Sequence, residues 1–256
     1  MQIDIDALGH LGAAAAAFVA GGVNAVAGGG TLITFPALLA LGVPGIAASA
    51  TNTVALSPGY FGGAYAQRGD LKGREGTLRS LLIAAAGGGL AGSILLVVSS
   101  DRFFSAVVPF LILAACALLG FQARLRKVLK IGQRTGERVS AGPGLTVGIF
   151  LASVYGGYFG AGVGIMMLAV MGVLLHDPLR VINAMKSALS LVINVAAACF
   201  LVFSGKVVWS LVVVMAVASL AGGLAGGKIA GRLDARVLRA VVITFGVIVA
   251  LKMLLF

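Results

Sequence analysis

The sequence predicts an all-α polytopic integral membrane protein built from two inverted repeats, and three observations support this. First, 60% of the 256 residues are hydrophobic and only 11% are charged, with a mean hydropathy of +1.09. Soluble domains are typically about 45–50% apolar and about 25% charged, so this much apolar surface requires lipid around it. Second, the apolar residues fall in long runs. Third, short motifs of the first half recur in the second.

The apolar runs define the expected membrane segments. They cover residues 8–27, 28–43, 46–67, 77–99 and 103–122, and then 144–159, 160–175, 181–204, 207–229 and 237–256. A spanning helix needs about 20 apolar residues, and the runs 28–43 and 160–175 are short by that measure. Each is joined to its predecessor by glycine, which favours two broken or re-entrant helix pairs and about 8–10 membrane segments in all. The alternative is that both runs of each pair cross separately, giving five crossings per half instead of three.

The chain divides at one polar segment. Residues 123–143 form the only long polar stretch, and it ends in the breaker cluster Gly142-Pro143-Gly144. We expect one membrane domain, with a first repeat over 1–122, a linker over 123–143 and a second repeat over 144–256.

The repeat is visible as a constant spacing. The segment 88–92 recurs as 222–226, and Pro44 recurs as Pro178, both 134 residues further on. The Gly-x-x-x-Gly spacing within 88–92 and 222–226 is typical of closely packed membrane helices, and we interpret those glycines as packing residues.

The positive charges predict the topology. Fifteen of the 19 lysines and arginines fall on the side of the linker, against Arg102 and Lys206 on the other, while Lys186 and Lys252 lie inside apolar runs. By the positive-inside rule the linker is cytoplasmic and both termini are periplasmic, so the net charge of +11 does not indicate nucleic-acid binding. Each half then crosses an odd number of times, so the halves are inverted. Inverted repeats are common in secondary transporters, which bind substrate near the midplane.

Glycine-rich joints precede both short runs. A helix that restarts after glycine presents backbone N–H groups and a partial positive charge, and glycine lets a ligand come close. We therefore expect the joints to bind an anion, although close packing alone is the alternative. The joint residues are Asn24, Gly28, Gly29, Gly30 and Thr31 in the first half and Gly160, Gly162 and Gly164 in the second.

Lys186 is the strongest single candidate for substrate binding. It lies inside the run 181–204, and charged residues within membrane segments usually mark a substrate or ion pathway. The alternative is that Lys186 extends to the cytoplasmic interface. Its counterpart at the repeat spacing is Asn52. The remaining candidates are polar residues on the same helices or beside the second joint, namely Thr53, Ser57, Tyr155, Ser187, Ser190 and Asn194.

The acidic residues exclude several functions. All eight lie outside the apolar runs, so the spans contain no carboxylate for a cation site, a proton relay or an intramembrane hydrolase. Cys116 and Cys199 lie inside apolar runs without zinc or iron–sulfur spacing. We expect no metal, no cofactor and no enzymatic activity, which leaves an anion pathway.

These residues resemble the sulfite exporter TauE/SafE family. The resemblance rests on the segments 22–30 and 41–44, on Pro36 and on the segment 50–52 in the first half, and on the segment 183–187, Asn194, Phe203, Gly205 and Trp209 in the second. It implies transport of sulfite, sulfonates or other sulfur-containing anions across the inner membrane, often outward. Val163, between Gly162 and Gly164, departs from the triple glycine of the first joint.

We therefore expect an inner-membrane exporter of a small sulfur-containing oxyanion. Its partners are the anion and the lipid bilayer, and homo-oligomerisation is left open. The alternative is a non-transporting membrane subunit or assembly factor for a partner protein.

Overall fold

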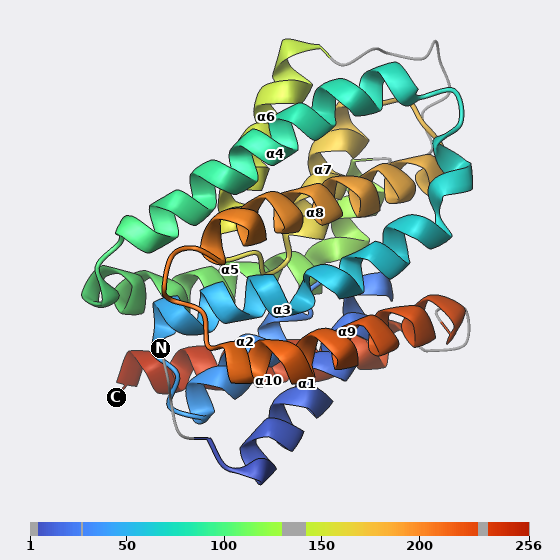
Figure 1. The fold of residues 1–256 in the computed structure, drawn as a ribbon. Coiled ribbons are helices and arrows are strands. Elements are labelled where there is room, and N and C mark those ends of the chain that lie inside the picture. Colours follow the sequence, from blue (N-terminus) through green and yellow to red (C-terminus); the bar gives the residue numbers. More distant parts are fainter. Residues whose placement is uncertain (1–4, 27, 130–141, 230–234, 256) are drawn as a thin grey trace.

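A computed structural model describes residues 5–26, 28–129, 142–229 and 235–255, and the regular secondary structure in this part is entirely helical (Figure 1). The α-helices are α1 (Ala7–Val26), α2 (Thr31–Ala40), α3 (Gly45–Ala66), α4 (Glu75–Val98), α5 (Asp101–Val128), α6 (Pro143–Tyr158), α7 (Val163–Leu174), α8 (Leu179–Leu201), α9 (Trp209–Ile229) and α10 (Ala235–Leu255). A short 3-10 helix, η1 (Arg68–Leu71), follows α3. The predicted all-α class is confirmed, and the helices follow the apolar runs closely.

Several helices are long enough to cross a membrane. The apolar spans are Ala7–Asn24, Glu75–Val98, Asp101–Leu125, Leu179–Leu201 and Trp209–Gly226. In contrast, α2 and α7 have 10 and 12 residues. At about 1.5 Å per residue they extend roughly 15 and 18 Å, well short of a hydrocarbon core of about 30 Å.

Each short helix folds back on the helix before it. A Cβ added to Gly9, near the start of α1, would lie 3.0 Å from the Leu41 side chain at the end of α2. In the second half, a Cβ on Gly148 of α6 would lie 2.8 Å from the Val170 side chain of α7. Each pair is therefore a broken hairpin whose two ends lie together. This agrees with the broken or re-entrant helix pairs that the sequence favours, while the number of membrane crossings per half stays a prediction.

The two halves interlock in matching pairs of helices. α1 packs on α9, and its counterpart α6 packs on α4; α3 packs on α9, and its counterpart α8 packs on α4. The central helices α3 and α8 pack on each other, as do α5 and α10. This reciprocal pattern is what a twofold relation between repeats would produce. The inversion of the repeats across a bilayer stays a prediction.

Glycine makes the tightest of these contacts possible. A Cβ on Gly222 of α9 would lie 1.9 Å from the Phe18 carbonyl oxygen of α1, and one on Gly92 of α4 would lie 2.0 Å from the Val154 carbonyl oxygen of α6. Gly88 and Gly226 make similarly close backbone approaches in the same two contacts. The interpretation of these glycines as packing residues is therefore confirmed.

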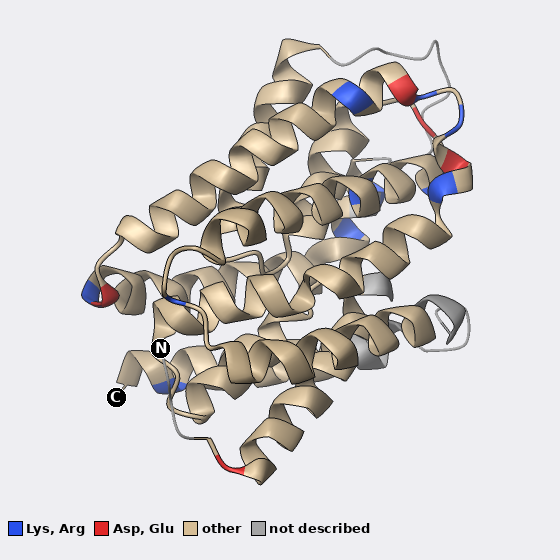
Figure 2. Ribbon diagram, in the orientation of Figure 1, with Lys and Arg blue, Asp and Glu red and all other residues tan. Residues whose placement is uncertain are grey.

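Charged residues gather at the ends of the bundle. Lys, Arg, Asp and Glu cluster at the end that holds η1, while fewer lie at the end where both described termini are found (Figure 2). α5 runs to Val128, so the predicted linker over 123–143 begins inside a helix. Residues 130–141 of that linker lie outside the described part.

We predict that Gly222→Ala destabilises the bundle, because a methyl group there overlaps the backbone of α1. Overpacking of this kind costs about 1–3 kcal/mol. The control is Gly12→Ala, since nothing lies within 4 Å of a Cβ at that position. Thermal melts in detergent should show a lower melting temperature for Gly222→Ala only. Equal melting of the two variants would contradict the close packing of α1 and α9.

Candidate anion-binding site

The tips of the two hairpins meet inside the bundle. A Cβ on Gly28, in the joint between α1 and α2, would lie 3.7 Å from the Cα of Gly164, in the first turn of α7. A Cβ on Gly160, in the joint between α6 and α7, would lie 4.0 Å from Thr31 Oγ1 at the start of α2. The structure therefore brings together the two joints that the sequence singled out.

Glycine is needed in both joints because the backbone turns through the left-handed region. The φ angles are +68° at Gly28 and +77° and +73° at Gly160 and Gly162. Side chains at such angles are strained, whereas glycine is not. The turns allow α2 and α7 to restart beside each other.

Asn24 holds the first joint together. Its Oδ1 accepts hydrogen bonds from the backbone N–H groups of Gly29, at 3.1 Å, and Gly30, at 2.7 Å. Buried N–H groups need a partner, and here the preceding helix supplies it. In the described conformation these two N–H groups therefore donate to Asn24, where the sequence analysis had them available to an anion.

Tyr155 has a related role in the second joint. Its hydroxyl donates to the carbonyl oxygen of Ala161 at 2.6 Å, and its own carbonyl oxygen accepts from the N–H groups of Phe159 and Gly160. Tyr155 thus braces the turn instead of lining a cavity.

A small cavity of about 20 Å³ lies beside the meeting point of the joints. Its lining includes half of the predicted site residues: Asn24, Gly28, Gly29, Gly160, Gly164, Lys186, Ser187 and Ser190. It also includes Gly59, Tyr60, Gly63 and Val163, which the sequence analysis missed. The spacing of Gly59 and Gly63, one turn apart on either side of a tyrosine, is the signal that could have identified them.

Lys186 faces this cavity. Its side chain is only 5% exposed, and its Cδ lies 3.4 Å from a Cβ position on Gly164. A lysine reaching the interface would place its chain along the bundle surface, so this burial argues against that alternative. No carboxylate is among the described residues that line the cavity.

Neutral donors surround the lysine. Tyr60 is hydrogen-bonded to the side chain of Asn194, which is its counterpart at the repeat spacing. Ser187 accepts from Gln67 Nε2 at 3.1 Å and donates to the carbonyl oxygen of Asn183 at 3.0 Å. These bonds connect α3 to α8 at the cavity wall and hold its polar groups in place.

Asn52 does not line the cavity and instead joins α2 to α3. Its Oδ1 accepts from the hydroxyl of Thr34, and its Nδ2 donates to Thr31 Oγ1 at 3.3 Å. Thr53 and Ser57 donate to the carbonyl oxygens of the residues four positions earlier. The predicted site residues outside the cavity lining are therefore Gly30, Thr31, Asn52, Thr53, Ser57, Tyr155, Gly162 and Asn194.

An aromatic cluster fills the core on the other side of the joints. Phe35 of α2 packs edge-on against Phe159, with ring centroids 5.1 Å apart, and against Phe104 of α5, at 6.3 Å. Tyr158 lies 5.7 Å from Phe104. The three Phe residues are at most 1% exposed, so this cluster belongs to the buried core.

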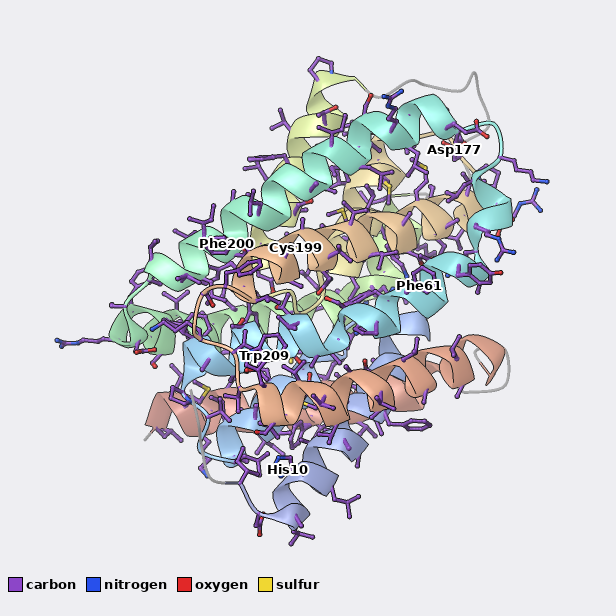
Figure 3. The ribbon with its side chains drawn as sticks, in the orientation of Figure 1. His10, Phe61, Asp177, Cys199, Phe200 and Trp209 are labelled. Carbon is purple, nitrogen blue, oxygen red and sulfur yellow. The ribbon has the colours of Figure 1, made fainter. Side chains whose placement is uncertain are left out.

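A buried ion pair links the two halves at the charged end. Arg74, just before α4, donates from Nε to Asp177 Oδ1 at 2.8 Å, and its Nη2 pairs with the other carboxylate oxygen. Figure 3 shows Asp177 at the end of the bundle, away from Trp209. The pair is separated by 103 residues and follows no local pattern, so the sequence analysis did not find it.

A helical bundle with several candidate membrane spans and a buried lysine at a cavity whose described lining holds no carboxylate has the features of a multi-pass membrane transporter. The sulfite exporter TauE/SafE family model matches residues 13–253, and the chain belongs to this family. A probable membrane transporter protein, ORF9, from Sinorhizobium sp. is 27% identical over 93% of this chain and 90% of its own length. A probable membrane transporter protein from Haemophilus influenzae is 31% identical over 99% and 96%, respectively. No solved structure matches the chain.

We predict that Asn24→Ala lowers stability, because it leaves the N–H groups of Gly29 and Gly30 without their acceptor. Each buried group left unsatisfied costs about 1–3 kcal/mol. The control is Asn183→Ala, since Asn183 Oδ1 has no hydrogen-bond partner in the described structure. Melting in detergent should separate the two variants. An unchanged melting temperature for Asn24→Ala would show that Asn24 does not hold the joint.

Proposed function

We propose that this transporter exports a small sulfur-containing oxyanion, sulfite or a sulfonate, through the cavity where the two hairpins meet. The observation that carries the proposal is the burial of Lys186 against Gly164 in a cavity without a lining carboxylate. A positive charge at a cavity attracts an anion, and this attraction is stronger in the protein interior than in bulk water because the interior has a lower dielectric constant.

Each polar group at the cavity has a proposed role in binding the substrate. Lys186 supplies the positive charge, and the hydroxyls of Tyr60, Ser187 and Ser190 orient the substrate oxygens. The start of α7 adds a partial positive charge from its backbone, because a helix N-terminus attracts anions. Asn24 and Asn52 act through the joints, which they hold in shape.

The proposed orientation places the charged end of the bundle in the cytoplasm. Arg68, Lys72 and Arg74 lie within or next to η1, and Arg180 lies in the first turn of α8. Arg102, in the first turn of α5, and Lys206, between α8 and α9, lie at the opposite ends of α4 and α8. Under the positive-inside rule the protein lies in the inner membrane with both termini periplasmic. The cavity is then nearer the cytoplasm, since α8 begins at Leu179, only seven residues before Lys186.

A non-transporting membrane subunit would have no use for the cavity or its lysine. The family and both relatives point to a transporter. We therefore retain transport as the function and treat the subunit alternative as less well supported.

Cysteine labelling tests the orientation. In a protein whose Cys116 and Cys199 are replaced by alanine, Arg102→Cys should react with an impermeant maleimide added to the periplasmic side of cells. Lys72→Cys should react only after the membrane is opened, and both positions are exposed. The opposite pattern of labelling would reverse the orientation and, with it, the export direction.

Transport in proteoliposomes tests the site. Lys186→Ala should reduce sulfite or sulfonate flux by roughly tenfold or more, corresponding to about 1.4 kcal/mol of lost binding for each factor of ten. Asn52→Ala should reduce it less, because Asn52 acts by positioning α2. Lys206→Ala, a lysine outside the cavity, is the control and should transport like the parent. Normal flux through Lys186→Ala would refute the site.

The membrane potential is the expected driving force, because no described residue of the cavity lining is a carboxylate that could bind a coupled cation. An inside-negative potential favours anion exit by roughly 2.3 kcal/mol per elementary charge per 100 mV. Flux should therefore follow a potential imposed with potassium and valinomycin when no proton gradient is present. Flux that ignores voltage and follows a pH step would instead indicate electroneutral proton symport.

A further inference from the structure

We propose that Gln67 is the gate at the cytoplasmic end of the cavity and the first side chain that binds the entering anion. This inference rests on the proposed function and orientation, and it adds the route by which the substrate reaches the cavity. It follows from the size of the cavity and from the hydrogen bonds that join α3 to α8 beside it.

The cavity is too small for the proposed substrate in the described conformation. Its volume is about 20 Å³, and a cavity needs about 10–15 Å³ to hold one water molecule. Sulfite and sulfonates carry several oxygens on a sulfur atom, and each is larger than a water molecule. The cavity must therefore widen before an anion can bind. Its lining comes mainly from α3, α8 and the two joints, so hydrogen bonds between α3 and α8 oppose the widening.

Gln67 lies where α3 ends and bridges the two helices at one end of the cavity. It follows Ala66, the last residue of α3, and is one turn beyond Gly63, the last α3 residue in the lining. Its Nε2 donates to the carbonyl oxygen of Gly63 at 3.2 Å and to Ser187 Oγ at 3.1 Å. Both acceptors belong to lining residues, one on α3 and one on α8. The amide therefore closes the cavity on the side that faces η1.

The two hydrogen bonds of this amide have different roles. A side-chain amide nitrogen carries two hydrogens, and a backbone carbonyl oxygen can only accept, so the nitrogen faces Gly63. The bond to Gly63 stays within one helical turn, so it keeps the side chain in place when α3 and α8 separate. The bond to Ser187 joins the two helices, so it must break. The N–H released in this way donates to an oxygen of the anion, which replaces Ser187 as its acceptor.

The hydrogen bonds further from η1 hold the inner part of the cavity. Tyr60 is hydrogen-bonded to the side chain of Asn194, and Ser57 Oγ donates to the Asn194 carbonyl oxygen at 3.4 Å. An opening at Gln67 leaves these contacts in place. The cavity can therefore open toward the cytoplasm while it stays closed toward the periplasm.

The chain next to Gln67 supplies positive charge outside the gate. An open hollow of about 620 Å³ is lined by Ala66, Arg68, Gly69 and Lys72. Arg68 and Lys72 are exposed, and the hollow adjoins Gln67 because Ala66 and Arg68 flank it in the sequence. Exposed positive charges at the mouth of a path raise the local concentration of anions. An anion drawn to this hollow therefore meets the amide of Gln67 before it enters the cavity.

Labelling of a cysteine in the lining from each side of the membrane tests the gate without requiring transport. In a protein whose Cys116 and Cys199 are replaced by alanine, Ser190→Cys places a thiol in the lining. The reagent is sulfonatoethyl methanethiosulfonate, an impermeant anion, added either to inside-out vesicles or to spheroplasts. Gln67→Ala should raise the labelling rate in inside-out vesicles by roughly fivefold, the factor expected for loss of one neutral hydrogen bond. The rate in spheroplasts should stay unchanged.

Two further variants support this assay. Thr146→Ala is the control, since it removes a hydroxyl that donates to the carbonyl oxygen of Gly142 in the first turn of α6, at the same end of the bundle. It should alter neither rate. Gly63→Cys is a second reporter in the lining, at a position where nothing lies within 4 Å of a Cβ. It should give the same result if Ser190→Cys does not fold.

Flux in proteoliposomes tests whether the amide binds the anion. Gln67→Glu keeps the size of the side chain but replaces the donor with a carboxylate, which repels an anion. Sulfite and methanesulfonate flux should fall by roughly tenfold or more, equivalent to about 1.4 kcal/mol per factor of ten. Gly76→Glu adds the same charge near the start of α4, where nothing lies within 4 Å of a Cβ, and should transport like the parent.

The possible outcomes separate this inference from the proposed function. Labelling that stays slow in Gln67→Ala, or that rises equally from both sides, would overturn the gate. Equal flux through Gln67→Glu and Gly76→Glu would overturn binding by the amide, and either result would leave anion transport standing. Absence of flux for every anion through the parent would overturn the proposed function. The labelling rates would then still decide whether Gln67 closes the cavity.

Discussion

The contact between the two hairpin tips is the constraint on which the rest of the structure depends. Gly28 and Gly164 come from different halves of the chain, and a Cβ added to either glycine would be in van der Waals contact with the Cα of the other, at 3.7 and 3.8 Å. Lys186 rests against the same point. The tight contacts of α1 with α9 and of α4 with α6 bring the hairpins this far into the bundle, since glycine in those contacts lets the helix backbones touch. The cavity is therefore a consequence of backbone packing.

Most polar side chains of the interior serve the backbone. Ser153 and Thr53 donate to carbonyl oxygens within their own helices, and Ser219 of α9 donates to the Ala55 carbonyl oxygen of α3. Such bonds remove the cost of burying a hydroxyl and, between helices, help to align them. Lys186, Tyr60 and Ser190 differ from these side chains because all three line the same cavity.

The two halves share a plan but differ in chemistry. α3 and α8 begin after Pro44 and Pro178 with almost the same backbone angles, φ −56° and ψ 147° against φ −57° and ψ 146°. Their equivalent positions Asn52 and Lys186 have different surroundings. The neutral side-chain amide of Asn52 is hydrogen-bonded to the hydroxyls of Thr31 and Thr34, and Asn52 does not line the cavity. Lys186 carries an ammonium group, and its side chain lines the cavity. The two equivalent positions therefore differ in that only the one occupied by Lys186 lines the cavity. Under the proposed orientation this cavity lies nearer the cytoplasmic side of the membrane.

The sequence by itself determined the all-α membrane class, the apolar runs that form the described helices and the glycine joints, because hydropathy runs and glycine spacing are local properties. It also singled out Lys186, since a charge inside an apolar run is unusual wherever it folds. Only the tertiary structure decided that Asn24 caps the first joint, that Asn52 braces α2, that Tyr60 lines the cavity and that Arg74 pairs with Asp177. These contacts join residues of different helices, and which polar group meets which partner depends on the packing of backbones that no local pattern specifies.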